Sequence, residues 1–390
     1  MKVEKMRITE RPADKGPCGV FNLKEETEPA PVPRTGSMAA KMSLCLLVLA
    51  AALVGLVDPI VRLISTPEEA VAGTTAYLTI CFIGIPCITA YNVLASILRG
   101  MGDSRSPMYF IAAACVVNIG LDFFFMGALR LGPAGAALGT TLSQAVSVLL
   151  ALCVILKRKS IRLSKSDFCP RKATMKNILS IGLPVAAQDG FIQVSFMLIT
   201  IMANQRGLTD AAAVGIVEKI ISFLFLVPSS MLSTVSALGA QNIGAGKYDR
   251  VDDILRYAIA IGVGFGAVMA LLMQFIAPSM VRPFTSDEAV VKAGAAYIRS
   301  YIFDCLFAGI QFSFSGYFCA WGRSGLSFLH NTLSILLVRV PGAWLACRFF
   351  PQTLVPMGLA PACGSLFSSI VCILLYRWMK RQNKPTGDKD

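Results

Sequence analysis

Residues 118–141 of the 390-residue chain read NIGLDFFFMGALRLGPAGAALGTT. This stretch joins the end of one apolar run to the start of the next through a short turn around Pro133. Neither run has the separate apolar and polar faces of a helix on the surface of a soluble protein. The two runs, residues 107–129 and 134–156, are each long enough to cross about 30 Å of hydrocarbon as a helix. The stretch therefore predicts two consecutive membrane-spanning helices with a tight turn between them.

The composition of the whole chain fits the same pattern. Hydrophobic residues make up 55% of the chain and charged residues 15%, with a mean hydropathy of +0.64, whereas a soluble domain has about 25% charged residues. Backbone N–H and C=O groups in hydrocarbon have to pair within their own segment, so the apolar blocks form helices. The predicted fold class is therefore all-α, a polytopic membrane protein. Its ten predicted spans are residues 40–63, 75–99, 107–129, 134–156, 178–203, 211–236, 252–281, 294–320, 327–350 and 356–379.

The basic residues predict the orientation of these spans. The formal net charge is +13, but Lys and Arg lie in the loops and tails between apolar blocks, which argues against a nucleic-acid-binding face. With the N-terminal tail inside, 27 of the 36 Lys and Arg residues lie on that side of the membrane and six on the other. Because basic loops stay in the cytoplasm, we expect a multi-pass protein of the plasma (inner) membrane with both termini cytoplasmic.

A repeat divides the chain into two lobes. IVRLISTPEEAVAGTTAYL (60–78) resembles MVRPFTSDEAVVKAGAAYI (280–298) at a constant offset of 220, and Gly102 and Gly322 continue the same register. Both copies keep one membrane orientation, so the repeat is parallel, an arrangement in which the substrate path lies between the halves. The second half holds six predicted helices and the first half four. We therefore expect the chain to lack the first two helices of a twelve-helix plan.

The domain prediction follows from the spans and the repeat. It comprises a polar, disordered cytoplasmic tail (1–39), a four-helix N-terminal lobe (40–156), a basic cytoplasmic linker (157–177), a six-helix C-terminal lobe (178–380) and a cytoplasmic tail (381–390).

Polar residues inside an apolar span are costly and mark functional sites. Asn118 and Asp122 are four residues apart and share one helix face. The turn at Pro133 folds the next helix back and brings Thr140 or Thr141 near that face. A carboxylate, an amide and a hydroxyl together suit a proton or Na⁺. The alternatives are a structural hydrogen-bonded cluster, or an Asp122 side chain that reaches the outer surface.

The second half has polar residues of its own within the spans. We interpret them as the lining of a wet substrate cavity. The candidate residues are Gln188, Asp189, Gln193, Glu218, Lys219, Asp304 and Gln311. The alternative is that Glu218, Lys219 and Arg339 neutralise one another as structural ion pairs. No catalytic residues, resident cofactor or metal site is predicted, since the single histidine and the scattered cysteines form no ligand set.

Three motifs carry a resemblance to a known family. LRGMGDSRSP (98–107), NIGLDFFFMGALRLGPAGAALGTTLSQ (118–144) and GAQNIGAGKYDR (239–250) resemble the multidrug and toxic-compound extrusion (MATE) family, over about residues 40–380. The resemblance implies a transporter of two six-helix lobes that exports cationic or amphipathic compounds in exchange for H⁺ or Na⁺. It also implies that Asn118, Asp122 and Thr140 occupy the cation site of the N-terminal lobe.

The resemblance adds two expectations about other acidic residues. The family's first helix often supplies a further aspartate to the N-lobe site, and this chain shows no such helix. In the second lobe some members use acids on the equivalents of the helices that carry Asp189 and Asp304. The leading hypothesis is therefore a cation-coupled exporter whose partners are the lipid bilayer and a cationic or amphipathic small molecule. Two alternatives stay open, a lipid-linked oligosaccharide flippase and a truncated remnant that does not transport.

Overall fold

The structure is a computed structural model that describes residues 47–63, 68–157 and 172–382. These residues are helical apart from short turns, and they contain nine helical segments long and apolar enough to span a membrane. The nine segments correspond to the last nine predicted spans, so the all-α polytopic fold is confirmed. The first predicted span lies partly outside the described residues, and its described part is helical over 47–55 and in α2 (Val57–Leu63). The predicted tail at 1–39 lies outside them, as do most of the linker and most of the C-terminal tail.

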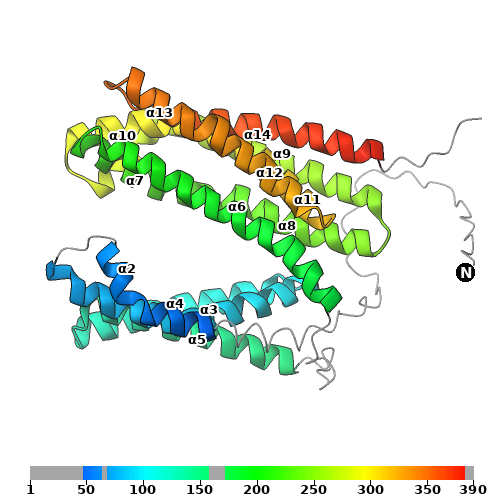
Figure 1. The fold of residues 1–390 in the computed structure, drawn as a ribbon, viewed down its shortest axis with the longest axis horizontal. Helices are drawn as coiled ribbons and strands as arrows, with labels where there is room; N and C mark the ends of the chain where they lie inside the picture. The colour runs from blue at the N-terminus through cyan, green and yellow to red at the C-terminus, as the bar shows by residue number, and fades with distance from the viewer. Residues whose placement is uncertain (1–46, 64–67, 158–171, 383–390) are drawn as a thin grey trace, which may run out of the picture. The chain divides into compact units, whose positions relative to one another are not determined.

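The N-terminal lobe contains the helices α2 to α5 (Figure 1). After α2, its elements are α3 (Glu68–Gly100), α4 (Arg105–Asp122), the π-helix η1 (Phe123–Ala128) and α5 (Gly132–Lys157). Helix α5 packs against both α3 and α4. The approach of α3 to α5 is close at Gly84, where an added Cβ would lie 2.8 Å from Thr141 Oγ1. Glycine at this position therefore lets the two helices meet.

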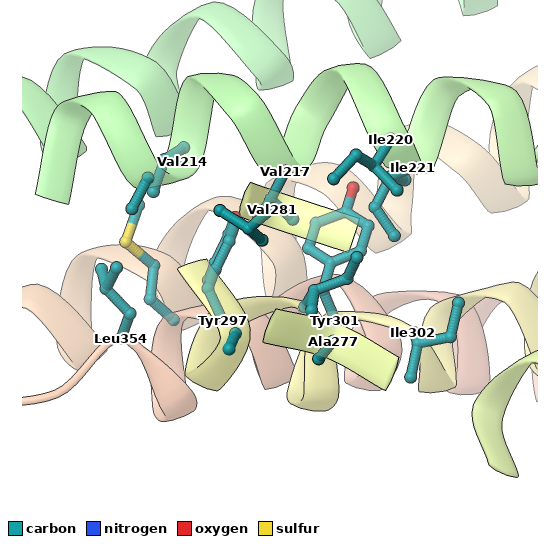
Figure 2. Close-up of a cluster of buried hydrophobic side chains, with 14 of the residues drawn as sticks. Val214, Val217, Ile220, Ile221, Ala277, Val281, Tyr297, Tyr301, Ile302 and Leu354 are labelled. Atoms are coloured by element: carbon teal, nitrogen blue, oxygen red, sulfur yellow. The ribbon is translucent and has the colours of Figure 1, made fainter. Parts of the chain in front are cut away.

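The C-terminal lobe contains the helices α6 to α14 (Figure 1). Helix α11 is its centre and packs against α8, α9 and α14, while α10 packs against α7. Figure 2 shows the apolar side chains of α7 and α10 that face each other in its core. The elements are α6 (Lys172–Asn204), α7 (Leu208–Leu224), α8 (Leu226–Gly244), α9 (Tyr248–Val281), η3 (Arg282–Phe284), α10 (Glu288–Tyr301), α11 (Phe303–Ala320), α12 (Ser324–Ser334), the π-helix η4 (Ile335–Arg339), α13 (Val340–Phe349) and α14 (Val355–Gln382).

The sequence repeat is visible in the backbone. Helix α3 and the α10–α11 pair begin and end at positions related by the 220-residue offset. Both copies end in the same turn, in which Gly102 and Gly322 have φ angles of 85° and 69°. The following amides, of Asp103 and Arg323, donate to carbonyls five residues back at 2.9 and 2.8 Å. This glycine-based helix end requires a left-handed backbone conformation. The two copies of the repeat therefore share this conformation as well as amino-acid identities.

One side chain joins the two lobes by hydrogen bonds. Gln241, near the end of α8, donates through Nε2 to the carbonyl oxygens of Arg99 (3.3 Å) and Gly100 (2.9 Å). These carbonyls lie in the last turn of α3; the Arg99 carbonyl also accepts from the Gly102 amide at 3.0 Å, and the Gly100 carbonyl accepts from Gln241. Gln241 therefore caps a helix of the other lobe.

Replacing Gln241 by Ala removes this cap. We expect faster amide hydrogen exchange in peptides that cover residues 97–103, because the last turn of α3 loses an interlobe partner. Hydrogen-exchange mass spectrometry measures this directly. The neighbouring Asn242 bonds only within its own helix, to the Leu238 carbonyl, and Asn242→Ala is the matched control. Equal exchange in the two variants would contradict the cap.

Candidate functional site

The predicted pair in the N-terminal lobe lies at the end of α4. Asn118 Nδ2 is 3.5 Å from Asp122 Oδ1, and both side chains are half-buried. They face α5 at Gly139, where an added Cβ would collide with Asp122 Oδ1 and lie 3.5 Å from Asn118 Nδ2. The Asp122 carboxylate thus packs directly against the α5 backbone at Gly139, where there is no side chain. A larger residue at Gly139 would take the space that the Asp122 carboxylate occupies.

A π-helix begins directly after Asp122. In this segment, η1, the Leu129 amide donates to the Phe124 carbonyl five residues back at 3.0 Å. Short π segments within α-helices are rare and occur often at functional sites. The segment changes the register of the helix just past the carboxylate and leads into a turn where Arg130 has a φ of 52°. The irregular backbone thus begins just past Asp122, whose own backbone is still regular α-helix.

The predicted hydroxyl does not complete the cluster in the same way. Thr140 follows Gly139 on α5 and is exposed, and its backbone carbonyl accepts a bond from Ser143 Oγ at 2.8 Å. Thr141, the other threonine that the sequence suggested, packs against Gly84 of α3. The structure thus brings Asn118 and Asp122 together and places Thr140 beside the glycine that they contact.

The charged residues of the C-terminal lobe form a separate group. Asp304 in the first turn of α11 is fully buried, and its Oδ2 lies 3.8 Å from Nη2 of Arg339 in η4. The same Nη2 donates to the hydroxyl of Tyr301 at 2.8 Å, and the guanidinium lies over the Phe196 ring at 4.9 Å from its centroid. Arg339 therefore pairs with Asp304, and not with Glu218 and Lys219 as the structural alternative proposed.

Glu218 and Lys219 differ in their surroundings. The Glu218 carboxylate is half-buried on α7 and accepts a shared hydrogen bond from Thr200 Oγ1, at 3.3 and 3.4 Å. Lys219, the next residue along the helix, is exposed. Only Glu218 of this pair therefore adds charge to the interior.

The four other predicted cavity residues do not form one cluster. Gln188 of α6 accepts from Ser327 Oγ at 2.7 Å, and Gln311 of α11 donates to Ser365 Oγ at 2.9 Å. Both amides are buried and join pairs of helices. Asp189 and Gln193 are exposed on α6.

Sequence reasoning missed the buried histidine network. His330 is fully buried on α12, with Nε2 at 2.9 Å from Ser315 Oγ and Nδ1 at 2.7 Å from Ser368 Oγ. The ring thereby joins α11, α12 and α14 through both nitrogens. The sequence does contain the signal, a lone histidine and several serines in apolar spans, but the partners are 15 and 38 residues away. Their proximity depends on tertiary packing.

Spanning helices in two repeat-related lobes, with charged groups enclosed among them, define a multi-pass membrane protein of the transporter class. A family model described as MatE matches residues 32–124 and 184–345. The chain belongs to the MatE family.

Relatives of known name support this assignment. The chain is 30% identical to the probable multidrug resistance protein YpnP of Bacillus subtilis, over 82% of this chain and 71% of YpnP. It is 26% identical to the multidrug export protein MepA of Staphylococcus aureus, over 68% of this chain and 59% of MepA. It therefore spans less than two thirds of MepA and somewhat more of YpnP.

Solved structures show the same fold. A Vibrio cholerae MATE transporter, VcmN, superposes with a TM-score of 0.84 at 18% identity, covering 90% of this chain and 80% of that one. A MOP superfamily transporter from Pyrococcus furiosus gives a TM-score of 0.80 at 20% identity, with coverage of 90% and 79%.

The packing of Asp122 against Gly139 generates a prediction. Gly139→Ala places a methyl group where the carboxylate lies and forces Asp122 away from Asn118. Overpacking of this kind costs about 1–3 kcal/mol, and we expect a lower thermal unfolding midpoint in detergent. Gly120→Ala on α4 is the control, since its added Cβ meets nothing within 4 Å. A Gly139→Ala protein as stable as the Gly120→Ala protein would contradict the close approach.

Proposed function

We propose that the protein is a cation-coupled antiporter that exports drugs or other cationic and amphipathic small molecules in exchange for H⁺ or Na⁺. The observation that carries the proposal is the Asp122 carboxylate within an apolar span, beside Asn118 and against Gly139. An ionisable residue at such a place is a functional candidate by default, because its burial is costly. The relatives named as multidrug resistance and export proteins support the substrate class.

Coupling follows from differential binding. A cation that neutralises Asp122 removes the cost of keeping a charged carboxylate among apolar side chains, and so favours one arrangement of the lobes. A substrate that favours the other arrangement is then driven against its gradient by the cation. The neutral amide of Asn118 and the hydroxyl of Thr140, which follows Gly139 on α5, are the proposed oxygen ligands for such a cation.

The substrate side of the proposal rests on the C-terminal lobe. Glu218 is half-buried beside Thr200, and an acid in a partly apolar setting attracts an organic cation. Asp189 and Gln193 on α6 and Lys219 on α7 are exposed and supply polar surface for an amphipathic molecule. Gln188, Asp304 and Gln311 support this surface from the lobe interior.

We also propose the membrane orientation and the chain division that the sequence suggests. The concentration of Lys and Arg in the tail at 1–39, the linker at 157–177 and the tail at 381–390 favours a cytoplasmic position for all three. The N-terminal lobe then comprises residues 40–156 and the C-terminal lobe residues 178–380.

Asp122→Asn tests the coupling role. The amide keeps the size of the side chain and cannot lose or gain the charge, so we expect efflux of a fluorescent organic cation from proteoliposomes to stop responding to an imposed H⁺ or Na⁺ gradient. The rate should fall to that of empty vesicles.

The matched control is Asp253→Asn. Asp253 is 56% exposed and, among the described residues, pairs with the surface residue Arg256, so gradient-driven efflux should persist. Gradient-driven efflux at the normal rate in Asp122→Asn would remove this carboxylate from the mechanism.

A further inference from the structure

The C-terminal lobe encloses a fully buried carboxylate, that of Asp304. Neither of its oxygens makes a hydrogen bond of normal length, and the Ser365 hydroxyl, which accepts from Gln311, interacts with it from α14. A carboxylate buried in this way stays ionised only beside a compensating charge. Among the residues that the structure describes, the cation within 4 Å is Arg339. Arg339 is therefore the charged side chain that compensates Asp304.

Arg339 is held in place from several helices. Its Nη2 donates to Tyr301 of α10 at 2.8 Å, its guanidinium lies over Phe196 of α6 at 4.9 Å, and it ends the π-helix η4. Tyr301 is itself buried in the core that α10 forms with α7 (Figure 2). An arginine keeps its proton at every physiological pH. The positive charge beside Asp304 is thus permanent and fixed in position.

We propose that Arg339 is a resident counter-ion of Asp304, neutralising this carboxylate in place of a free H⁺ or Na⁺. The inference rests on the proposed antiport and deepens it, since it confines the exchangeable cation to the Asp122 side. The two lobes then differ: the Asp122 carboxylate has the neutral amide of Asn118 as its neighbour, and the Asp304 carboxylate has the guanidinium of Arg339.

Glu218 is a second acid in the interior of the C-terminal lobe. Within residues 172–382, Glu218 has a hydrogen bond from Thr200 and no ion pair. Two further titratable groups lie here: Tyr301, whose hydroxyl accepts from Arg339, and Tyr297, whose buried hydroxyl has no hydrogen-bond partner. With Asp304 already neutralised, Glu218 is the half-buried acid of this interior left to meet a positively charged substrate, alongside the exposed Asp189 of α6.

The test compares cation responses of thermal stability, which needs no transport. All variants carry Asp122→Asn, so that the proposed N-lobe site contributes nothing. Purified protein is unfolded in Na⁺ or in N-methylglucamine at equal ionic strength, and at mildly acidic and mildly alkaline pH. The variants are the parent, Arg339→Gln, the double variant Asp304→Asn/Arg339→Gln, and Arg256→Gln as a surface control whose side chain is 75% exposed.

The proposal makes a distinct prediction for each variant. Arg339→Gln unfolds at a lower temperature than the parent and regains several degrees in Na⁺ or at acidic pH, because Asp304 now needs an external cation. The double variant loses that response with the carboxylate, and Arg256→Gln behaves as the parent. An Arg339→Gln protein whose unfolding temperature changes neither with Na⁺ nor with acidic pH would overturn the proposal.

Should Arg339→Gln fail to fold, Asp304→Asn in the same background decides the question. If Arg339 already neutralises Asp304, removing the carboxylate leaves the cation response of the parent unchanged. If a free cation binds Asp304 in the parent, the response disappears, and the proposal is wrong. Neither result depends on Asp122, so the proposed antiport is tested separately by the efflux assay.

Discussion

The absence of water from the hydrocarbon core is the constraint on which this structure depends. Every backbone polar group within a span has to find its partner inside the chain, and a polar side chain buried there is costly without one. The lobes satisfy this requirement with a few contacts between helices, such as the buried His330 between Ser315 and Ser368 and Asp304 beside Arg339. Because a charged residue inside a span is costly, each charged residue in such a contact is a candidate for a functional role.

The repeat places unlike charges on related helices. In the 220-residue register, α4 with η1 corresponds to the α12–η4–α13 segment. Both segments contain a π-helix next to a charged residue, Asp122 before η1 and Arg339 at the end of η4. The two π-helices do not coincide in this register, because η1 maps to residues 343–348 within α13 and η4 maps to residues 115–119 within α4.

The positions of the spans could be predicted from the sequence, but only some of the side-chain contacts could. Apolar length placed the nine described spans because it is a local property, and four-residue spacing placed Asn118 beside Asp122. Spacing did not reveal that Arg339 faces Asp304, since that choice depends on how α11 and η4 pack. Nor did it indicate the π-helices, which arise from a shifted register that no residue pattern marks. Thr140 shows the same limit: being near Asp122 along the fold did not determine which way its side chain points.

The central claim is that Asp122 lies in a lobe interior that a cation can reach. Labelling with a hydrophobic carbodiimide, which reacts with protonated carboxyl groups, followed by peptide mass spectrometry measures this directly. The account predicts modification of Asp122 that slows as pH rises and is further slowed by the coupling cation or by a transported organic cation. An Asp122 that is never modified, or is modified at a rate indifferent to both cations, would contradict it.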